Sequence, residues 1–228
     1  MAISSEFLRT VTLFSSLDDS QLARMLAVFK EQEFRKGDII LMEEDTGKYM
    51  YIVLEGRVKV SRVLPSGKEM ILAFHEKGDY FGEMALIDGG TTPATVTAMR
   101  PTAIAFVGKR EFNDVLIKDP TINFALLTTL CTRCRDAWTQ IEVLNFNNAD
   151  ARIRTALFHL CQRKGERTDE GIRINLHLTH KEIADMTGIS RETATRVLNN
   201  LEHQNVLRVE TKHYIIRDPE MLMMTSMS

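Results

Sequence analysis

The sequence predicts an α+β protein with an N-terminal double-stranded β-helix (jelly roll, or β-roll), a long central helix and a C-terminal winged helix-turn-helix. Three observations support this fold class. Nine of the 12 glycines lie between Gly37 and Gly108, among short β-rich runs. A long apolar pattern of helical period follows Pro120. Two short helical runs separated by a glycine then precede a hairpin pattern. We expect three segments, covering residues 1–110, 111–147 and 148–228.

The composition is that of an ordinary globular protein, with 44% hydrophobic and 26% charged residues. No apolar run approaches the ~20 residues of a membrane span, and the N-terminus lacks a secretory pattern. Three cysteines are too few for a disulfide framework. We therefore expect a cytoplasmic protein with no membrane partner. The net charge of −2 does not itself favour nucleic acid, so any DNA binding must depend on locally placed cations.

The glycine-rich segment, residues 1–110, contains six short runs of β-branched and apolar residues between turn signals. The expected strands are Asp38–Met42, Tyr49–Leu54, Val58–Leu64, Glu69–His75, Ala94–Met99 and Thr102–Val107. Short strands at this spacing indicate a β-roll. A short amphipathic helix is expected before them, over Ser20–Phe29.

The middle segment predicts a dimerisation helix. Asp119 supplies an N-cap and Pro120 the first helical residue, so a helix of roughly 39 Å is expected over Pro120–Asn145. Apolar residues spaced by three and four predict a coiled-coil seam that forms a homodimer interface. They are Leu127, Leu130, Cys134, Ala137, Ile141 and Leu144. A second line, Phe124, Cys131 and Trp138, is expected to pack on the chain's own β-roll. A single buried core helix is the alternative.

The last segment contains a helical run over Ala151–Arg163 and an alternating strand over Gly171–Leu178. Thr179 and Glu182 form a capping-box pattern that begins a helix ending at Gly188. Ser190 then caps a second helix that extends to about His203. This spacing is typical of a helix-turn-helix.

Polar side chains gather where the second helix begins, which is the end that enters the major groove in such motifs. Arginine suits the paired acceptors of guanine, and glutamate accepts from cytosine. The expected DNA-binding residues are Thr179, Ser190, Arg191, Glu192, Thr195, Arg196 and Lys212. Lys212 lies at the turn of an expected hairpin, Leu207–Val209 with Tyr214–Ile216. A solvated helix face with a Glu192–Arg196 ion pair is the alternative.

Two motifs resemble the catabolite-activator/fumarate-nitrate-regulator (CRP/FNR) superfamily of bacterial transcription regulators. They are the Ser-Arg-Glu-Thr-x-x-Arg run from Ser190 to Arg196 and the run Tyr80–Leu86 that follows the glycine-punctuated strands. The resemblance covers about Phe14 to Asp218. It implies a homodimer, a small-molecule effector pocket in each β-roll, a hinge near residues 147–148, and control of transcription through RNA polymerase bound beside double-stranded DNA.

The resemblance also implies effector-binding positions, which are Gly82, Glu83, Met84, Ala85, Thr92 and Trp138. Gly82 and Glu83 match the phosphate and ribose ligands of members that bind cyclic nucleotides. Thr92-Pro93 replaces the family's phosphate-binding Arg-Ser, and Ala137-Trp138 replaces its adenine-binding Thr-Ser. Because an arginine–phosphate contact is worth roughly 1.5–3 kcal/mol, cyclic AMP is not expected to be the effector.

The cysteine and histidine residues bear on other cofactors. An iron–sulfur cluster is not expected, because the N-terminal cysteines of oxygen-sensing members are absent. Haem is an alternative through His75, although a packing role is the simpler interpretation. Cys131 and Cys134 lack further ligands for a zinc site, so we predict no metal and favour apolar packing over a thiol switch. A regulatory module acting on a protein partner is the other alternative. No enzyme motif is found.

Overall fold

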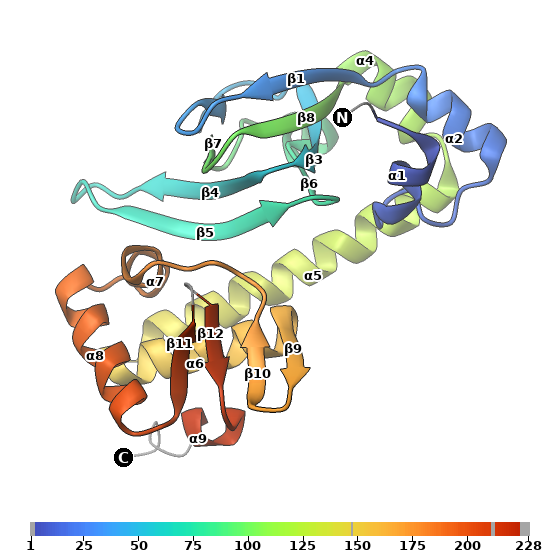
Figure 1. Cartoon of the computed structure of the whole chain (residues 1–228). Coiled ribbons are helices and arrows are strands. Elements are labelled where there is room, and N and C mark those ends of the chain that lie inside the picture. Colours follow the sequence, from blue (N-terminus) through green and yellow to red (C-terminus); the bar gives the residue numbers. More distant parts are fainter. Residues whose placement is uncertain (1–2, 147, 211–212, 224–228) are drawn as a thin grey trace. The chain divides into compact units, whose positions relative to one another are not determined.

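The computed structural model describes residues 3–146, 148–210 and 213–223 (Figure 1). The chain divides into two compact units, residues 1–64 with 71–133 and residues 65–70 with 134–228. The first unit contains the β-roll and the second contains the helix-turn-helix, which confirms the predicted fold class. None of the described helices is long and apolar enough to cross a membrane.

The β-roll consists of two four-stranded sheets, with strand orders β1-β8-β3-β6 and β2-β7-β4-β5. Their strands are β1 (Lys30–Phe34), β2 (Ile39–Leu41), β3 (Tyr49–Glu55), β4 (Arg57–Val63), β5 (Glu69–Glu76), β6 (Tyr80–Phe81), β7 (Thr95–Ala98) and β8 (Thr102–Gly108). Strand β3 is buried along most of its length because it lies inside its sheet, between β8 and β6. Helices α1 (Ser5–Thr10) and α2 (Asp19–Leu26) pack apolar side chains into one hydrophobic core with those of β3.

All six expected strands of this unit are confirmed within one residue at each end. Helix α2 is also confirmed, although it ends at Leu26 rather than Phe29, and it begins at a capping box formed by Asp18 and Gln21. Strand β1 was not expected from the sequence. Its side chains are exposed up to the last residue, because β1 pairs only with β8 at a sheet edge, and it therefore lacks an alternating pattern.

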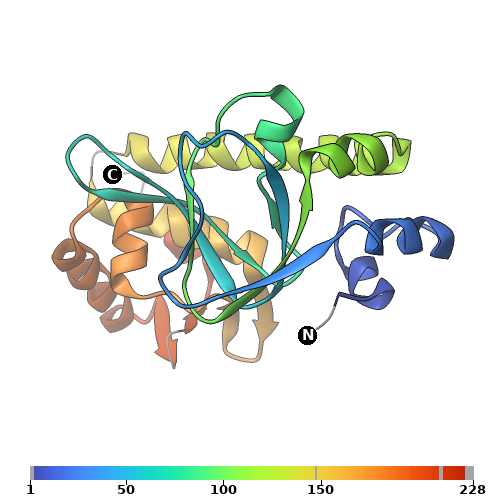
Figure 2. The same cartoon turned by 90° about the horizontal axis from the view of Figure 1, so that it is seen from above.

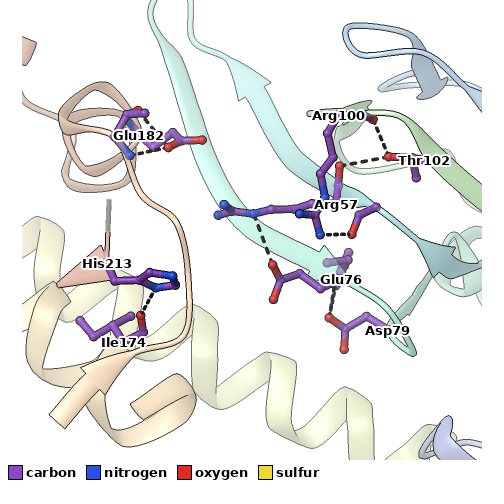
Figure 3. A network of polar contacts seen from close by, with 11 residues as sticks. Arg57, Glu76, Asp79, Arg100, Thr102, Ile174, Glu182 and His213 are labelled. Atoms are coloured by element: carbon purple, nitrogen blue, oxygen red, sulfur yellow. Dashed lines mark hydrogen bonds and ion pairs between the residues drawn. The ribbon is translucent and has the colours of Figure 1, made fainter. Parts of the chain in front are cut away.

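A polar network supports the turn between β3 and β4 (Figure 3). Arg57 is buried, with its Nε 3.9 Å from Glu76 Oε1 and its guanidinium 4.1 Å from the centre of the Phe74 ring. Arg100 donates to the Gly56 carbonyl at 3.0 Å, and the Thr102 hydroxyl donates to the Arg100 carbonyl at 2.8 Å. These contacts compensate for burying polar groups inside the roll.

A single helix, α5 (Pro120–Asn145), continues from the first unit into the second. It has the predicted bounds, and Asp119 caps it by accepting from the Thr121 amide at 2.9 Å. It is preceded by α4 (Lys109–Glu111) and the π-helical turn η1 (Phe112–Leu116).

The expected packing of α5 is wrong in one respect. Phe124 and Cys131 do not pack against the chain's own β-roll, since both are exposed, and Trp138, in the second unit, is exposed as well. Ile122 and Leu126 lie in the core of the roll instead. Two neighbouring apolar lines give a wide stripe, and the sequence period alone does not determine which line faces the roll.

The second unit surrounds a four-stranded sheet of order β11-β12-β10-β9. Its elements are α6 (Ala149–Lys164), β9 (Gly165–Thr168), β10 (Gly171–Ile174), α7 (His180–Thr187), α8 (Arg191–His203), β11 (Leu207–Glu210), β12 (His213–Ile216) and α9 (Pro219–Met223). The strand expected over Gly171–Leu178 ends at Ile174. Ile174 pairs with Gly165, where β9 begins, so β9 offers no further partner.

Arg154 of α6 hydrogen-bonds to three other residues of this unit. The side chain is buried and donates to Asp150 Oδ2 at 2.6 Å, to Gln204 Oε1 at 3.1 Å and to the Met221 carbonyl at 3.2 Å. It therefore joins α6 to the C-terminal end of α8 and to α9. A buried charge with this many acceptors is compensated in place, and its loss leaves several groups without partners.

Replacing Arg154 with alanine is expected to lower the free energy of unfolding by about 3 kcal/mol. This is the low end for a broken buried ion pair, because Asp150 keeps a third of its side chain exposed. The matched control is Arg208→Ala, which removes exposed ion pairs to Glu170 and Glu210 and should cost about 0–1 kcal/mol. Urea unfolding measures both, and equal losses would contradict the role given to Arg154.

Candidate functional site

The helix-turn-helix is fixed by three local devices. Thr179 Oγ1 accepts from the Glu182 amide at 3.2 Å, and Glu182 Oε2 accepts from the Thr179 amide at 2.6 Å, which completes the predicted capping box (Figure 3). Gly188 ends α7 with φ +68°, a conformation that favours glycine. Ser190 Oγ then accepts from the Thr193 amide at 3.2 Å and starts α8. These contacts therefore fix where α7 begins and ends and where α8 begins.

The predicted DNA-reading side chains lie together at this end of α8. Arg191, Glu192 and Arg196 are exposed, and with Thr195 they line one shallow surface hollow. The inward side of the helix is apolar, with Val197, Leu198, Leu201 and Ala194 buried.

Both arginines present unpaired charge at this surface. Within the described residues, no ion pair joins Glu192 to Arg196. Hydrogen bonds from its own backbone N–H and from Ser190 lower the pKa of Glu192, so its carboxylate is an acceptor at neutral pH. His180 Nδ1 lies 3.0 Å from Thr195 Oγ1 and holds that side chain against α7. Strands β11 and β12 form the expected hairpin, while Lys212 at its turn lies outside the described residues.

The effector residues expected in the β-roll surround α3 (Glu83–Asp88). Gly82 precedes this helix with φ +85°, and a Cβ there would lie 2.7 Å from the Tyr49 carbonyl oxygen. Only glycine fits that position. In Figure 2, α3 lies beside α5, and an ion pair between Glu83 and Arg133 joins the two helices.

Arg133 is a candidate site residue that the sequence did not indicate. Its guanidinium donates to Glu83 Oε1 and to the Tyr80 carbonyl, and it lies 5.2 Å from the centre of the Tyr80 ring. Glu83 is fully buried, so desolvation raises its pKa, while the charge of Arg133 opposes that shift. The family resemblance places its phosphate-binding arginine where this chain has Thr92-Pro93, whereas Arg133 comes from α5.

A cavity of about 80 Å³ opens beside this ion pair. It is lined by Leu41, Val60, His75, Phe81, Gly82, Met84, Ala85, Thr92, Pro93, Ala94, Val96 and Arg133. The cavity therefore brings together four of the six expected effector residues. Glu83 does not line the cavity, but it is ion-paired with Arg133, which does. Trp138 lies on α5 in the second unit, with 65% of the residue exposed.

The two halves of the chain match two protein families. Residues 31–119 match the cyclic nucleotide-binding domain, and residues 151–224 match the Crp-like helix-turn-helix domain. The cAMP-activated global transcriptional regulator CRP of Pasteurella multocida is 31% identical over 73% of this chain and 80% of its own length. The chain belongs to the CRP/FNR family.

Other CRP/FNR members match along almost the full length. A CRP-like cAMP-activated global transcriptional regulator of Mycobacterium tuberculosis is 28% identical over 95% of this chain and 97% of its own. The solved structure of a CooA mutant from Carboxydothermus hydrogenoformans has a TM-score of 0.78 and 25% identity over 95% of both chains. This chain is therefore a Crp-like transcription regulator with a DNA-binding helix-turn-helix.

The pocket of this CRP/FNR protein does not fit a haem. Its volume of about 80 Å³ is well below the roughly 300–1,000 Å³ of ordinary ligand pockets. The His75 ring is stacked on Phe81 at 5.8 Å, with its Nδ1 3.9 Å from Asp79 Oδ2. Thr92 is buried, and its hydroxyl donates to the Met42 carbonyl, so it supplies no charge for a phosphate.

The pH dependence of the free energy of unfolding should reveal that the carboxylate of Glu83 is buried. Because the pKa of Glu83 in the folded chain is raised above 4.5, its ionisation costs stability as the pH rises through that value. Glu83→Gln removes this cost. We expect the free energy of unfolding of the variant, minus that of the wild type, to be flat below about pH 4.5 and to increase above it. Urea unfolding across pH 4–8 measures this difference.

The matched control is Glu55→Gln, which removes an exposed carboxylate from β3. A difference for Glu83→Gln that shrinks as the pH rises would contradict the assignment.

Proposed function

We propose that this regulator binds double-stranded DNA as a homodimer, on an inverted repeat with half-sites similar to TGTGA, under control of a small-molecule effector other than cyclic AMP. One observation carries the DNA half of this proposal: Arg191, Glu192 and Arg196 are exposed together at the capped start of α8. We also propose RNA polymerase as a partner, because the relatives are named as transcriptional regulators.

The base preference follows from the side chains. Arg191 and Arg196 are five residues apart, on neighbouring turns of α8, so each can pair with the N7 and O6 acceptors of a guanine. Glu192 lies between them in the chain and accepts from the amino group of a cytosine on the opposite strand. Thr195 is half-buried and contributes less. Together these contacts favour a G-T-G-A type core in each half-site.

The dimer is supported by an exposed apolar stripe on α5. Phe124, Leu127, Trp138 and Ile141 are 74, 61, 65 and 56% exposed in the single chain. With Cys131 and Cys134, which are also exposed, they are spaced by three and four in a heptad pattern. This stripe shares Leu127, Cys134 and Ile141 with the seam predicted from sequence. Leu130 and Leu144 are half-buried, and Ala137 is exposed beside the stripe. A second copy of α5 covers such a stripe symmetrically.

The effector is proposed to occupy the pocket beside Glu83 and Arg133. The pocket walls are mostly apolar, and its one guanidinium is already paired with a carboxylate. A cyclic phosphate would have to take Arg133 from the buried Glu83, at the cost of an uncompensated charge. A small, mainly apolar molecule fits this chemistry better than a nucleotide.

Substitution of Arg196 tests the reading surface. Arg196→Ala should weaken operator binding by about 1–3 kcal/mol and relax the preference at one guanine. Lys212→Ala, at the expected phosphate contact, should instead weaken all sequences alike and reduce the salt dependence. Selection from a random DNA library followed by gel shifts measures both. Half-sites without paired guanines, or unchanged operator binding by Arg196→Ala, would overturn the assignment.

A charge in the stripe should dissociate the dimer. Ile141→Asp places a carboxylate in the proposed interface, where burial without a partner costs several kcal/mol. The control, Thr132→Asp, alters an exposed residue outside the stripe. Sedimentation should show monomers for Ile141→Asp only, with DNA affinity lost in parallel. A dimer of unchanged stability would place the interface elsewhere.

Cyclic AMP should not bind with useful affinity. Isothermal titration calorimetry of the wild type is expected to show no binding at micromolar concentrations, because the pocket lacks both volume and a free arginine. Micromolar binding of cyclic AMP would refute this part of the proposal.

A further inference from the structure

Two of the three cysteines lie on the stripe of the proposed dimer, where their thiol chemistry has no role in packing. Cys131 and Cys134 are free thiols, both exposed, one helical turn apart on the apolar stripe of α5. The third, Cys161, is buried in the second unit, and burial raises the pKa of its thiol to about 12. Exposed cysteines are uncommon because the residue type is usually buried. This pair therefore calls for a chemical explanation.

We propose that Cys131 and Cys134 of two subunits together bind one Zn²⁺ ion at the dimer axis. The inference rests on the homodimer proposed above. Within the described residues, a single chain holds no group of three metal-ligating side chains, so one subunit cannot complete such a site. Two subunits supply four thiolates, the ligand number and type of a closed structural zinc site.

The helix geometry matches that ligand set. In a two-stranded coiled coil of parallel helices, each position of the stripe faces its own copy across the axis. Cys131 and Cys134 then form adjacent layers separated by about 4.5 Å, three times the helical rise. A zinc–sulfur bond of about 2.3 Å requires sulfur–sulfur distances of about 3.8 Å in a tetrahedron. Small side-chain rotations close that difference, so four sulfurs from two layers can surround one ion.

The charges also match. Binding replaces the four thiol protons, which pass to solvent, and leaves a centre with a net charge of −2. Arg135 follows Cys134 directly, is exposed, and takes a position flanking the stripe. The two copies of Arg135 supply two positive charges beside the centre. Apolar packing alone would use neither the sulfur atoms nor these cations.

The test uses the full-length protein, reduced, stripped with a chelator and then dialysed against Zn²⁺. We expect one zinc per two chains by elemental analysis, and Co²⁺ substitution should give the intense visible absorption of a tetrahedral cobalt thiolate. Cys131→Ser and Cys134→Ser should each abolish both signals while sedimentation still shows dimers. Cys161→Ala is the matched control and should keep both.

The outcomes separate the two proposals. A wild-type dimer that binds no Zn²⁺, or zinc binding that survives in either serine variant, overturns the metal site and leaves the regulator's dimer intact. A wild-type dimer that only forms a disulfide when treated with oxidised glutathione, with no zinc bound by the reduced form, also overturns it. A monomeric wild type overturns the metal site and the dimer together.

Discussion

Helix α5 has two apolar faces, one buried in the β-roll and one exposed in the single chain, and the rest of the structure depends on what covers them. Ile122 and Leu126 are buried in the core of the β-roll. The neighbouring face, from Phe124 to Ile141, carries large apolar side chains that a single chain leaves in water. Full burial of one such side chain is worth about 1.5–3 kcal/mol. In the proposed dimer a second copy covers this face, and the two chains together provide two recognition helices.

Arg133 connects the effector pocket to the same helix. It stands between Cys131 and Cys134 in the chain, while its guanidinium lines the pocket and pairs with buried Glu83. Any ligand that displaces this guanidinium leaves a carboxylate without compensation inside the roll. One ion pair therefore joins the pocket to α5. The main chain at Gly82 also lies so close to the Tyr49 carbonyl that no side chain fits there.

Local patterns in the sequence predicted what depends on local chemistry. The six β-roll strands, the bounds of α5 and both helix caps of the DNA-reading motif follow from alternation, helical period and capping residues. Tertiary contacts decided the rest. Strand β1 forms because it pairs with β8, and β10 ends opposite Gly165, the first residue of its antiparallel partner β9. No local pattern near Gly82 indicates Arg133, because its contact with Glu83 joins residues 50 positions apart.

The central claim is that the stripe on α5 is the dimer interface, and the chain offers a direct probe of it. Trp138 is the only tryptophan and lies on that stripe. Acrylamide quenching of its fluorescence reports how accessible the indole ring is. We predict weak quenching in the wild-type protein and strong quenching in monomeric Ile141→Asp. Equally strong quenching in a wild-type protein that sediments as a dimer would contradict the account, because Trp138 would then lie outside the interface.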